Sequence, residues 1–272
     1  MTVQALLVSV FLLVGVLAWV FQERIAFQPP RGPYPDPGIV QRVSYSARDG
    51  QPLFAYVIGE PTTPRGILLV FHGNADLAVR SIDWAQEVVK RTGAAVMLAE
   101  YRGYMGLEGR PSYEGARHDA EAAYRYATDS LQAEKERLAF YGHSLGSAIA
   151  AELAVDHPPR ALLLESPFTS ARDMATSMVG TWFTVIFWRF VSRIHFDTAR
   201  IVESLDVPVS VAHGGGDLIV PWRMGEEVYR RARRKGEWFF IPHASHNDLR
   251  VIGGDGYWEW LTRSLAQLTS DE

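Results

Sequence analysis

The stretch FYGHSLGSAIA (140–150) places Ser144 between Gly142 and Gly146, where a strand-like segment meets a helix-like one. The residues just upstream, RLAFY (137–141), are typical of a short buried strand, and those downstream repeat Ala, Ile and Leu at helical spacing. A sharp turn between strand and helix crowds the backbone, so small residues are needed on both sides of the bend. The pattern predicts a nucleophile elbow that holds out the Ser144 hydroxyl. A helix N-cap beside a glycine turn is the structural alternative.

Length and composition limit the classes of protein that the chain can form. Its 272 residues are enough for one large α/β domain or two small ones. The hydrophobic content of 47% and charged content of 21% exclude wholesale disorder. A formal net charge of -4 gives no reason to expect a nucleic acid partner. With no cysteine, disulfides, thiolate catalysis and cysteine-ligated zinc are excluded.

The beginning of the chain contains an apolar run without charge from Val3 to Phe21. As a helix this run would span roughly 28 Å, about the thickness of the hydrocarbon core of a bilayer. No Lys or Arg precedes it, which favours an uncleaved anchor over a signal peptide. We therefore expect residues 1–24 to form a single-pass transmembrane anchor that places the protein at a membrane, on a side that stays open. Residues 25–39 are rich in proline and predict a stiff linker.

From residue 40 to residue 272, strand-like and helix-like segments alternate. Two half-exposed strands flank the turn at 48–50. Apolar strand-like runs follow at 66–71, 94–100, 137–141, 161–166, 207–214 and 237–242. Helix-like segments lie near 80–92, 112–129, 144–157, 172–194, 221–235 and 257–268. Short apolar strands that alternate with helices predict an α/β domain, with a mostly parallel sheet covered by helices on both faces.

A serine nucleophile needs a base, and the base needs a carboxylate that orients it. In such a sheet both partners are expected on loops that follow later strands. His246 follows the strand-like run at 237–242 and is preferred over its neighbour His243. Asp217 follows three glycines at the end of the run at 207–214, and is the preferred acid. The other candidate acids are Glu165, Asp206 and Asp248.

Acyl transfer also needs hydrogen-bond donors for the developing oxyanion. We expect the first donor to be the backbone N–H of Leu145, directly after the nucleophile. The second is the N–H of Asn74, in a loop after the strand-like run at 66–71, where Gly73 allows close approach. No group of residues has the spacing of a metal site, and no glycine loop of the phosphate-binding kind occurs. The sequence therefore predicts neither a metal nor a cofactor.

An insertion at 167–200 is rich in large apolar side chains. It is interpreted either as a helix packed on the sheet or as a lid that forms an acyl pocket. The second interpretation predicts four substrate-binding residues, Trp182, Phe183, Phe187 and Trp188.

Six motifs carry a resemblance to a known family. They are VFHGNA, EYRGY, YGHSLGSAIA, ESPFTS, GGGDLIVP and SHND, in this order. With them the chain resembles the serine hydrolases of the α/β-hydrolase superfamily from about residue 25 to the C-terminus. It is most similar to the membrane-anchored branch that includes depalmitoylating enzymes and bacterial relatives. The resemblance implies Ser144 as nucleophile, Asp217 as acid and His246 as base.

The resemblance also implies a reaction and a substrate. The chain is expected to hydrolyse small-molecule carboxylic esters or thioesters through an acyl-enzyme intermediate, with acyl or lipid substrates at a membrane as one option. Two alternatives stay open. The first is a serine aminopeptidase, and the second is a non-catalytic α/β-hydrolase scaffold that binds a partner.

Overall fold

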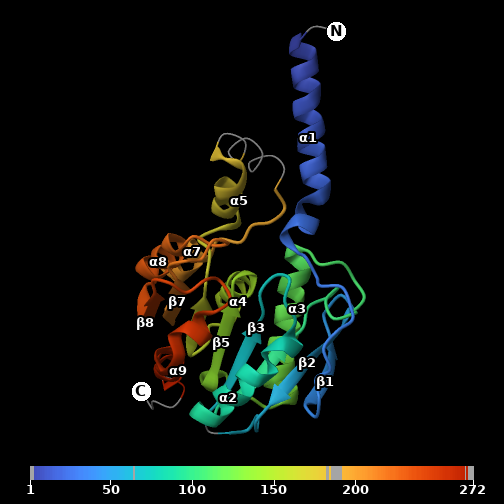
Figure 1. The fold of residues 1–272 in the computed structure, drawn as a ribbon. Coiled ribbons are helices and arrows are strands. Elements are labelled where there is room, and N and C mark those ends of the chain that lie inside the picture. The colour runs from blue at the N-terminus through green and yellow to red at the C-terminus, as the bar shows by residue number, and fades with distance from the viewer. Residues whose placement is uncertain (1–2, 64, 182–183, 185–191, 267, 269–272) are drawn as a thin grey trace.

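The computed structural model describes residues 3–63, 65–181, 184, 192–266 and 268 (Figure 1). Within them, one sheet has the strand order β1-β2-β4-β3-β5-β6-β7-β8. Its strands are β1 (Gln41–Ser46), β2 (Pro52–Ile58), β3 (Ile67–Phe71), β4 (Ala95–Ala99), β5 (Leu138–His143), β6 (Ala161–Glu165), β7 (Pro208–Gly214) and β8 (Arg234–Ile241). Strand β2 is antiparallel to β1 and β4, and all other neighbours are parallel. The predicted mostly parallel sheet is confirmed.

Helices cover both faces of this sheet, as predicted (Figure 1). The described helices are α1 (Val3–Ala26), α2 (Ile82–Thr92), α3 (Tyr113–Arg125), α4 (Leu145–Asp156), α5 (Ala171–Val179), α7 (Thr198–Ser204), α8 (Trp222–Arg231) and α9 (Leu249–Ala266). Short helical turns are η1 (Ala78–Ser81), η2 (Tyr126–Ser130) and η3 (Lys135–Arg137). Helices α3, α4, α7 and α8 form one layer, and α2 lies beside α9. Helices α1 and α5 project from one end of the sheet (Figure 1).

The central strands have the burial that their composition predicts. Every residue of β3, β4, β6 and β7 is buried. A parallel strand with helices on both faces has no polar side, so its sequence is a continuous apolar run. By contrast, β1 lies at one edge of the sheet and has mostly exposed residues.

Two element boundaries differ from those expected. Helix α8 ends at Arg231, and β8 begins at Arg234 within the run that was assigned to the helix. Strand β8 lies at the other edge of the sheet, where arginine side chains can reach solvent. Helix α9 begins at Leu249, earlier than expected. Its first turns were not found in the sequence because a kink at Gly254, with φ +49°, interrupts the helical periodicity.

The prediction of a transmembrane anchor over residues 1–24 is contradicted. Helix α1 forms there, but none of the helices in the described ranges is both long and apolar enough to cross a bilayer. The last turns of α1 contact Arg193 of the same chain. The buried Gln22 accepts a hydrogen bond from the backbone N–H of Arg193 at 2.6 Å, and the Arg193 guanidinium pairs with Glu23 at 3.6 Å. The expected membrane location and the expected membrane partner both depended on this anchor, and they are therefore wrong as well.

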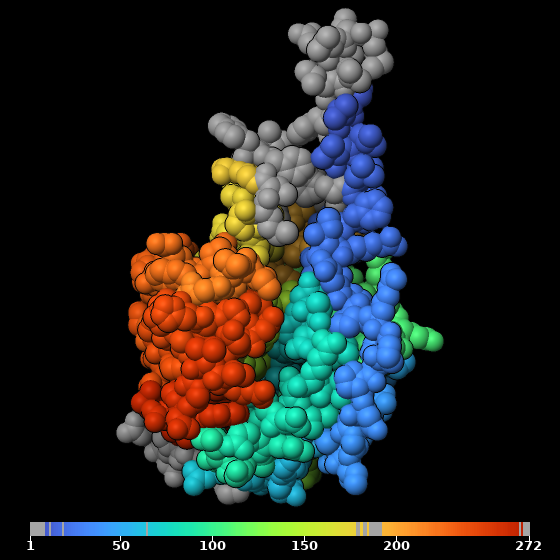
Figure 2. Space-filling model, viewed as in Figure 1, coloured from blue at the N-terminus to red at the C-terminus, as the bar shows by residue number. Residues whose placement is uncertain are grey.

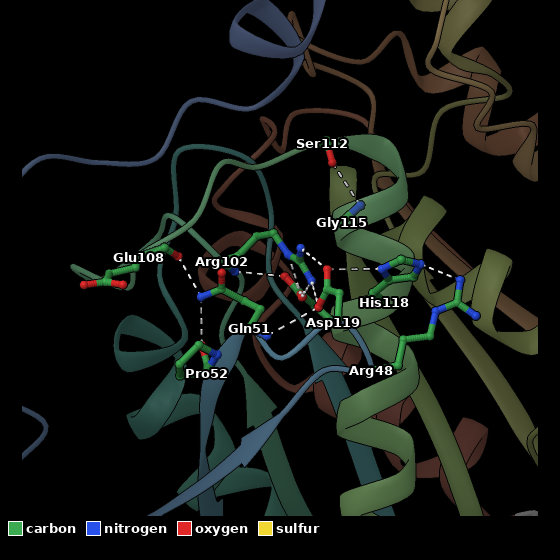
Figure 3. A network of polar contacts seen from close by, with 10 residues as sticks. Arg48, Gln51, Pro52, Arg102, Glu108, Ser112, Gly115, His118 and Asp119 are labelled. Carbon is green, nitrogen blue, oxygen red and sulfur yellow. Dashed lines mark hydrogen bonds and ion pairs between the residues drawn. The ribbon is translucent and has the colours of Figure 1, made fainter.

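A polar cluster ties the loop after β4 to α3 and to the turn between β1 and β2 (Figure 3). The Arg102 guanidinium donates to Asp119 at 2.6 and 2.8 Å and to Asp49 at 2.7 and 3.2 Å. The Asp119 side chain is 1% exposed, whereas that of Asp49 is 36% exposed. One guanidinium therefore serves a fully buried carboxylate and a partly solvated one.

We predict that Arg102→Met lowers the free energy of unfolding by about 3–5 kcal/mol, because it leaves the buried Asp119 carboxylate without its cation. The control Asp49→Asn should cost no more than about 1 kcal/mol, since water already screens that pair. Urea unfolding measures both changes. The double variant Arg102→Met, Asp119→Leu should lose less than the sum of its two single variants. An Arg102→Met loss no larger than that of the control would contradict the assignment.

Candidate active site

Ser144 stands at the turn between β5 and α4 in a strained backbone conformation, with φ +51° and ψ −113°. A non-glycine residue at such a φ costs energy that the surrounding structure must supply. The two flanking glycines are required by contact. A Cβ added at Gly142 would lie 2.2 Å from the carbonyl oxygen of Gly146, and one at Gly146 would lie 2.0 Å from that of Phe71. The bend therefore exists only with glycine at both positions.

The loops after β7 and β8 bring Asp217 and His246 together. His246 Nδ1 lies 2.7 Å from Asp217 Oδ2, and Asp217 Oδ1 accepts the backbone N–H groups of Ile219 at 2.9 Å and Val220 at 2.8 Å. Because the carboxylate only accepts, Nδ1 carries the proton and Nε2 of a neutral ring is left as the basic nitrogen. The competing His243 is exposed and lies outside this contact.

A second histidine, His213, also binds Asp217 and was missed in the sequence. Its Nε2 lies 3.2 Å from Asp217 Oδ2 and 3.0 Å from the carbonyl oxygen of Val220. Burial would raise the pKa of Asp217, but the hydrogen bonds from His213 and His246 outweigh it and hold this pKa well below its ordinary value. Asp217 therefore stays ionised. The available signal was the position of His213 at the end of β7, four residues before the acid.

Ser144, Leu145 and His246 line one cavity of about 910 Å³. Within the described part of the chain, no residue forms a hydrogen bond with the Ser144 hydroxyl. Catalytic hydrogen bonds commonly close only when a substrate is bound. The structure thus places the predicted nucleophile and base on the same cavity.

The predicted oxyanion donors lie at two segment ends that meet at this cavity. Leu145 is the first residue of α4, where backbone N–H groups have no partner within the helix. Asn74 is held by its side chain, whose Oδ1 accepts from the N–H groups of Gln28 at 2.7 Å and Ala75 at 3.0 Å and from the Tyr104 hydroxyl at 3.0 Å. Neither backbone N–H is used by a hydrogen bond among the described residues. Both are free to donate to a ligand.

A buried ion pair supports the loop that carries Asn74. His72 Nε2 lies 2.7 Å from Glu100 Oε1, and His72 Nδ1 lies 2.8 Å from the carbonyl oxygen of Gly73. Both partners only accept, so both ring nitrogens carry protons. Burial lowers the pKa of His72, but the Glu100 carboxylate outweighs it and leaves this pKa above its ordinary value. The ring is therefore an imidazolium that fixes the loop.

Two distant segments wall the cavity. The end of α1 contributes Gln22, Ile25 and Ala26. The segment after β6 contributes mainly apolar side chains, among them Phe168, Ala171, Met174, Ala175, Ile194 and Phe196. In Figure 2 the blue α1 and the yellow α5 rise above the body of the molecule. The predicted substrate-binding residues Trp182, Phe183, Phe187 and Trp188 lie outside the described residues.

The cavity also has a polar corner that sequence analysis did not find. Glu165 Oε2 accepts hydrogen bonds from the hydroxyls of Tyr141 at 2.5 Å and Tyr257 at 2.9 Å. The Trp84 indole N–H donates to the Tyr257 hydroxyl at 3.0 Å. All four side chains line the cavity. Glu165, one of the candidate acids in the sequence, is thus placed beside the elbow with phenols, and not a histidine, as its partners.

Comparisons with known proteins agree with this fold. The family model Hydrolase_4, described as "Serine aminopeptidase, S33", matches residues 62–204. An uncharacterized protein of Mycobacterium tuberculosis is 31% identical over 255 residues, which cover 92% of this chain and 89% of that protein. The lysophosphatidylserine lipase ABHD12 of Danio rerio is 32% identical over 180 residues, covering 60% and 46%. An esterase of Pyrococcus furiosus shares the fold, with a TM-score of 0.66 at 18% identity over 88% of this chain and 98% of its own. The chain therefore belongs to the Hydrolase_4 family of α/β hydrolases.

Proposed function

We propose that this protein is a serine hydrolase that cleaves carboxylic ester or thioester bonds through an acyl-enzyme intermediate. The observation that carries the proposal is the hydrogen bond between His246 and Asp217 at the cavity that Ser144 lines. The strained elbow and the two free backbone N–H groups support it. A relative named as a lipase and a structural neighbour named as an esterase support the reaction class.

The proposed reaction has two halves. Ser144 Oγ attacks the carbonyl carbon while its proton moves to His246 Nε2. The oxyanion that forms accepts hydrogen bonds from the backbone N–H groups of Leu145 and Asn74. The bond to the leaving oxygen or sulfur then breaks, and His246 returns the proton to that atom. A water molecule, deprotonated by His246, hydrolyses the acyl-Ser144 ester. Asp217 stays ionised throughout and stabilises the imidazolium.

The cavity favours an acyl group as the part of the substrate that is enclosed. Its volume of about 910 Å³ holds a lipid-sized chain, and apolar side chains of the segment after β6 form much of its wall. We extend the proposal to the insertion at 167–200 as a lid over that chain. The resemblance to depalmitoylating enzymes keeps thioesters among the proposed substrates. A peptide bond is a weaker candidate, because a peptide backbone needs polar partners along its length.

Ser144→Ala should abolish labelling by a fluorophosphonate probe, because alanine has no hydroxyl to form the covalent adduct. The control Ser177→Ala, at an exposed serine on α5, should label like the wild type. In-gel fluorescence measures both, with melting temperature as the check on folding. Undiminished labelling of Ser144→Ala would remove it as the nucleophile. A wild type that neither labels nor hydrolyses esters would favour the non-catalytic scaffold.

His246→Ala should lower kcat for p-nitrophenyl butyrate by roughly 10⁴- to 10⁶-fold, because the members of such a triad act as a unit. Asp217→Asn should cost less than His246→Ala, since the nucleophile and base both remain. His243→Ala is the matched control, three residues away and exposed, and should leave kcat unchanged. Steady-state kinetics of the folded variants decides. The reverse ranking of the two histidines would refute the assignment.

Ala175→Phe should shift the acyl preference of the enzyme to shorter chains, because it fills part of the cavity that Ala175 lines. In the wild type, kcat/KM should rise roughly fourfold for each added methylene until the cavity is full. The control Ser177→Phe places the same ring on an exposed position of α5 and should keep the wild-type profile. The measurement is kcat/KM for p-nitrophenyl esters from acetate to decanoate. Identical profiles for the two variants would argue against an acyl chain in this part of the cavity.

A further inference from the structure

Glu165 is a buried carboxylate beside the nucleophile. It ends strand β6 and is 7% exposed, and its carbonyl oxygen accepts the backbone N–H of Ser144 at 2.9 Å. Tyr141 and Tyr257 both donate to Oε2. Oε1 takes part in no hydrogen bond among the described residues. Protein atoms do not enclose Oε1 completely, so it retains an accessible surface at the cavity that Glu165 lines.

The charge of Glu165 is the unbalanced one in this region. The three other buried carboxylates each have a basic partner: Glu100 binds His72, Asp119 binds Arg102, and Asp217 binds His246. For Glu165, no described Arg, Lys or His side chain forms an ion pair. A buried carboxylate without a cation carries a large desolvation cost that two phenols reduce but do not cancel. A cation brought by a ligand would cancel it.

The Glu165 carboxylate contacts two aromatic residues, Tyr141 and Tyr257, and Trp84 packs against Tyr141. The rings of Trp84 and Tyr141 lie 4.8 Å apart between centroids, and both residues line the cavity. Ring faces attract cations, most strongly where water is excluded. Burial and the nearby Glu165 carboxylate raise the pKa of Tyr141 well above its ordinary value, so this phenol remains a neutral O–H donor. The corner therefore combines one negative charge, one open acceptor and apolar walls.

We propose that Glu165, with Trp84, Tyr141 and Tyr257, is a subsite for a protonated amine, and that the hydrolysed ester carries an ammonium group. This inference rests on the proposed function, because the amine would belong to the substrate that Ser144 attacks. The other charged residues that line the cavity are the His72 imidazolium, which pairs with Glu100, and three further side chains, those of Asp76, Arg80 and Arg250. None of these three is buried, and Arg80 pairs with Asp76 at 3.5 Å. Water screens them, so Glu165 dominates the buried part of the cavity.

The test is calorimetric titration of the full-length Ser144→Ala variant with three probes. n-Hexylammonium should bind at least about tenfold more tightly than 1-hexanol, which has the same chain without the charge. One charge-assisted hydrogen bond in a desolvated site accounts for a difference in affinity of this size. Hexyltrimethylammonium should bind more weakly than n-hexylammonium, because it has no N–H for Oε1. Binding needs no turnover, so this result is independent of whether the enzyme hydrolyses esters. Equal affinity for n-hexylammonium and 1-hexanol would overturn the subsite.

The substitution Glu165→Gln in the same background removes the charge but keeps a carbonyl acceptor for the two tyrosines. It should reduce n-hexylammonium binding to the level of 1-hexanol. The control Glu152→Gln changes the charge of a glutamate that also accepts from a tyrosine, Tyr113 at 3.1 Å, but lies off the cavity. It should leave all three affinities unchanged. A preference for the amine that survives Glu165→Gln would overturn the proposal. If that variant does not fold, the probe comparison in Ser144→Ala alone decides.

Discussion

The close approach of helix α4 to strand β3 is the constraint on which the candidate site depends. At Gly146 the space for a Cβ is already filled by the Phe71 carbonyl group. This contact presses the start of α4 against the end of β3, so the loop after β3 and the turn at Ser144 open onto one cavity. The amides of Asn74 and Leu145 then reach the same space from two segments. A larger residue at 146 would separate them, whatever the chemistry of the side chains.

Three buried carboxylates near this cavity show how partners decide what an acid does. Asp217 receives two imidazoles and is held ionised beside the basic histidine. Glu100 pairs with a charged imidazolium and serves as a support for a loop. Glu165 receives two phenols and keeps one oxygen for the cavity. The residue types are nearly the same, so the differences arise from which hydrogen-bond donors the fold brings to each one.

Much of the sheet could be predicted from the sequence, because strands buried on both faces must be apolar throughout and glycine is required on both sides of Ser144. The order of Ser144, Asp217 and His246 along the chain was also accessible. The partners of Glu165 were not, since Tyr257 is 92 residues away and only tertiary packing brings it there. The apolar run at the N-terminus led to the wrong prediction of a transmembrane anchor for a related reason. Hydropathy shows that a segment avoids water, but not that Gln22 at its end would bind Arg193, 171 residues later.

The contact between Gln22 and Arg193 means that two segments far apart in the sequence form the cavity together. Gln22, Ile25 and Ala26 form part of its wall, and the bond to Arg193 joins this wall to Ser192 and Ile194, which flank Arg193 and also line the cavity. An expression strategy that trims the N-terminal helix to gain yield would thus remove a wall of the cavity. The shortened chain would keep Ser144, Asp217 and His246 and yet have a more open cavity. Substrate profiles measured on such a fragment would describe a different specificity from that of the whole chain.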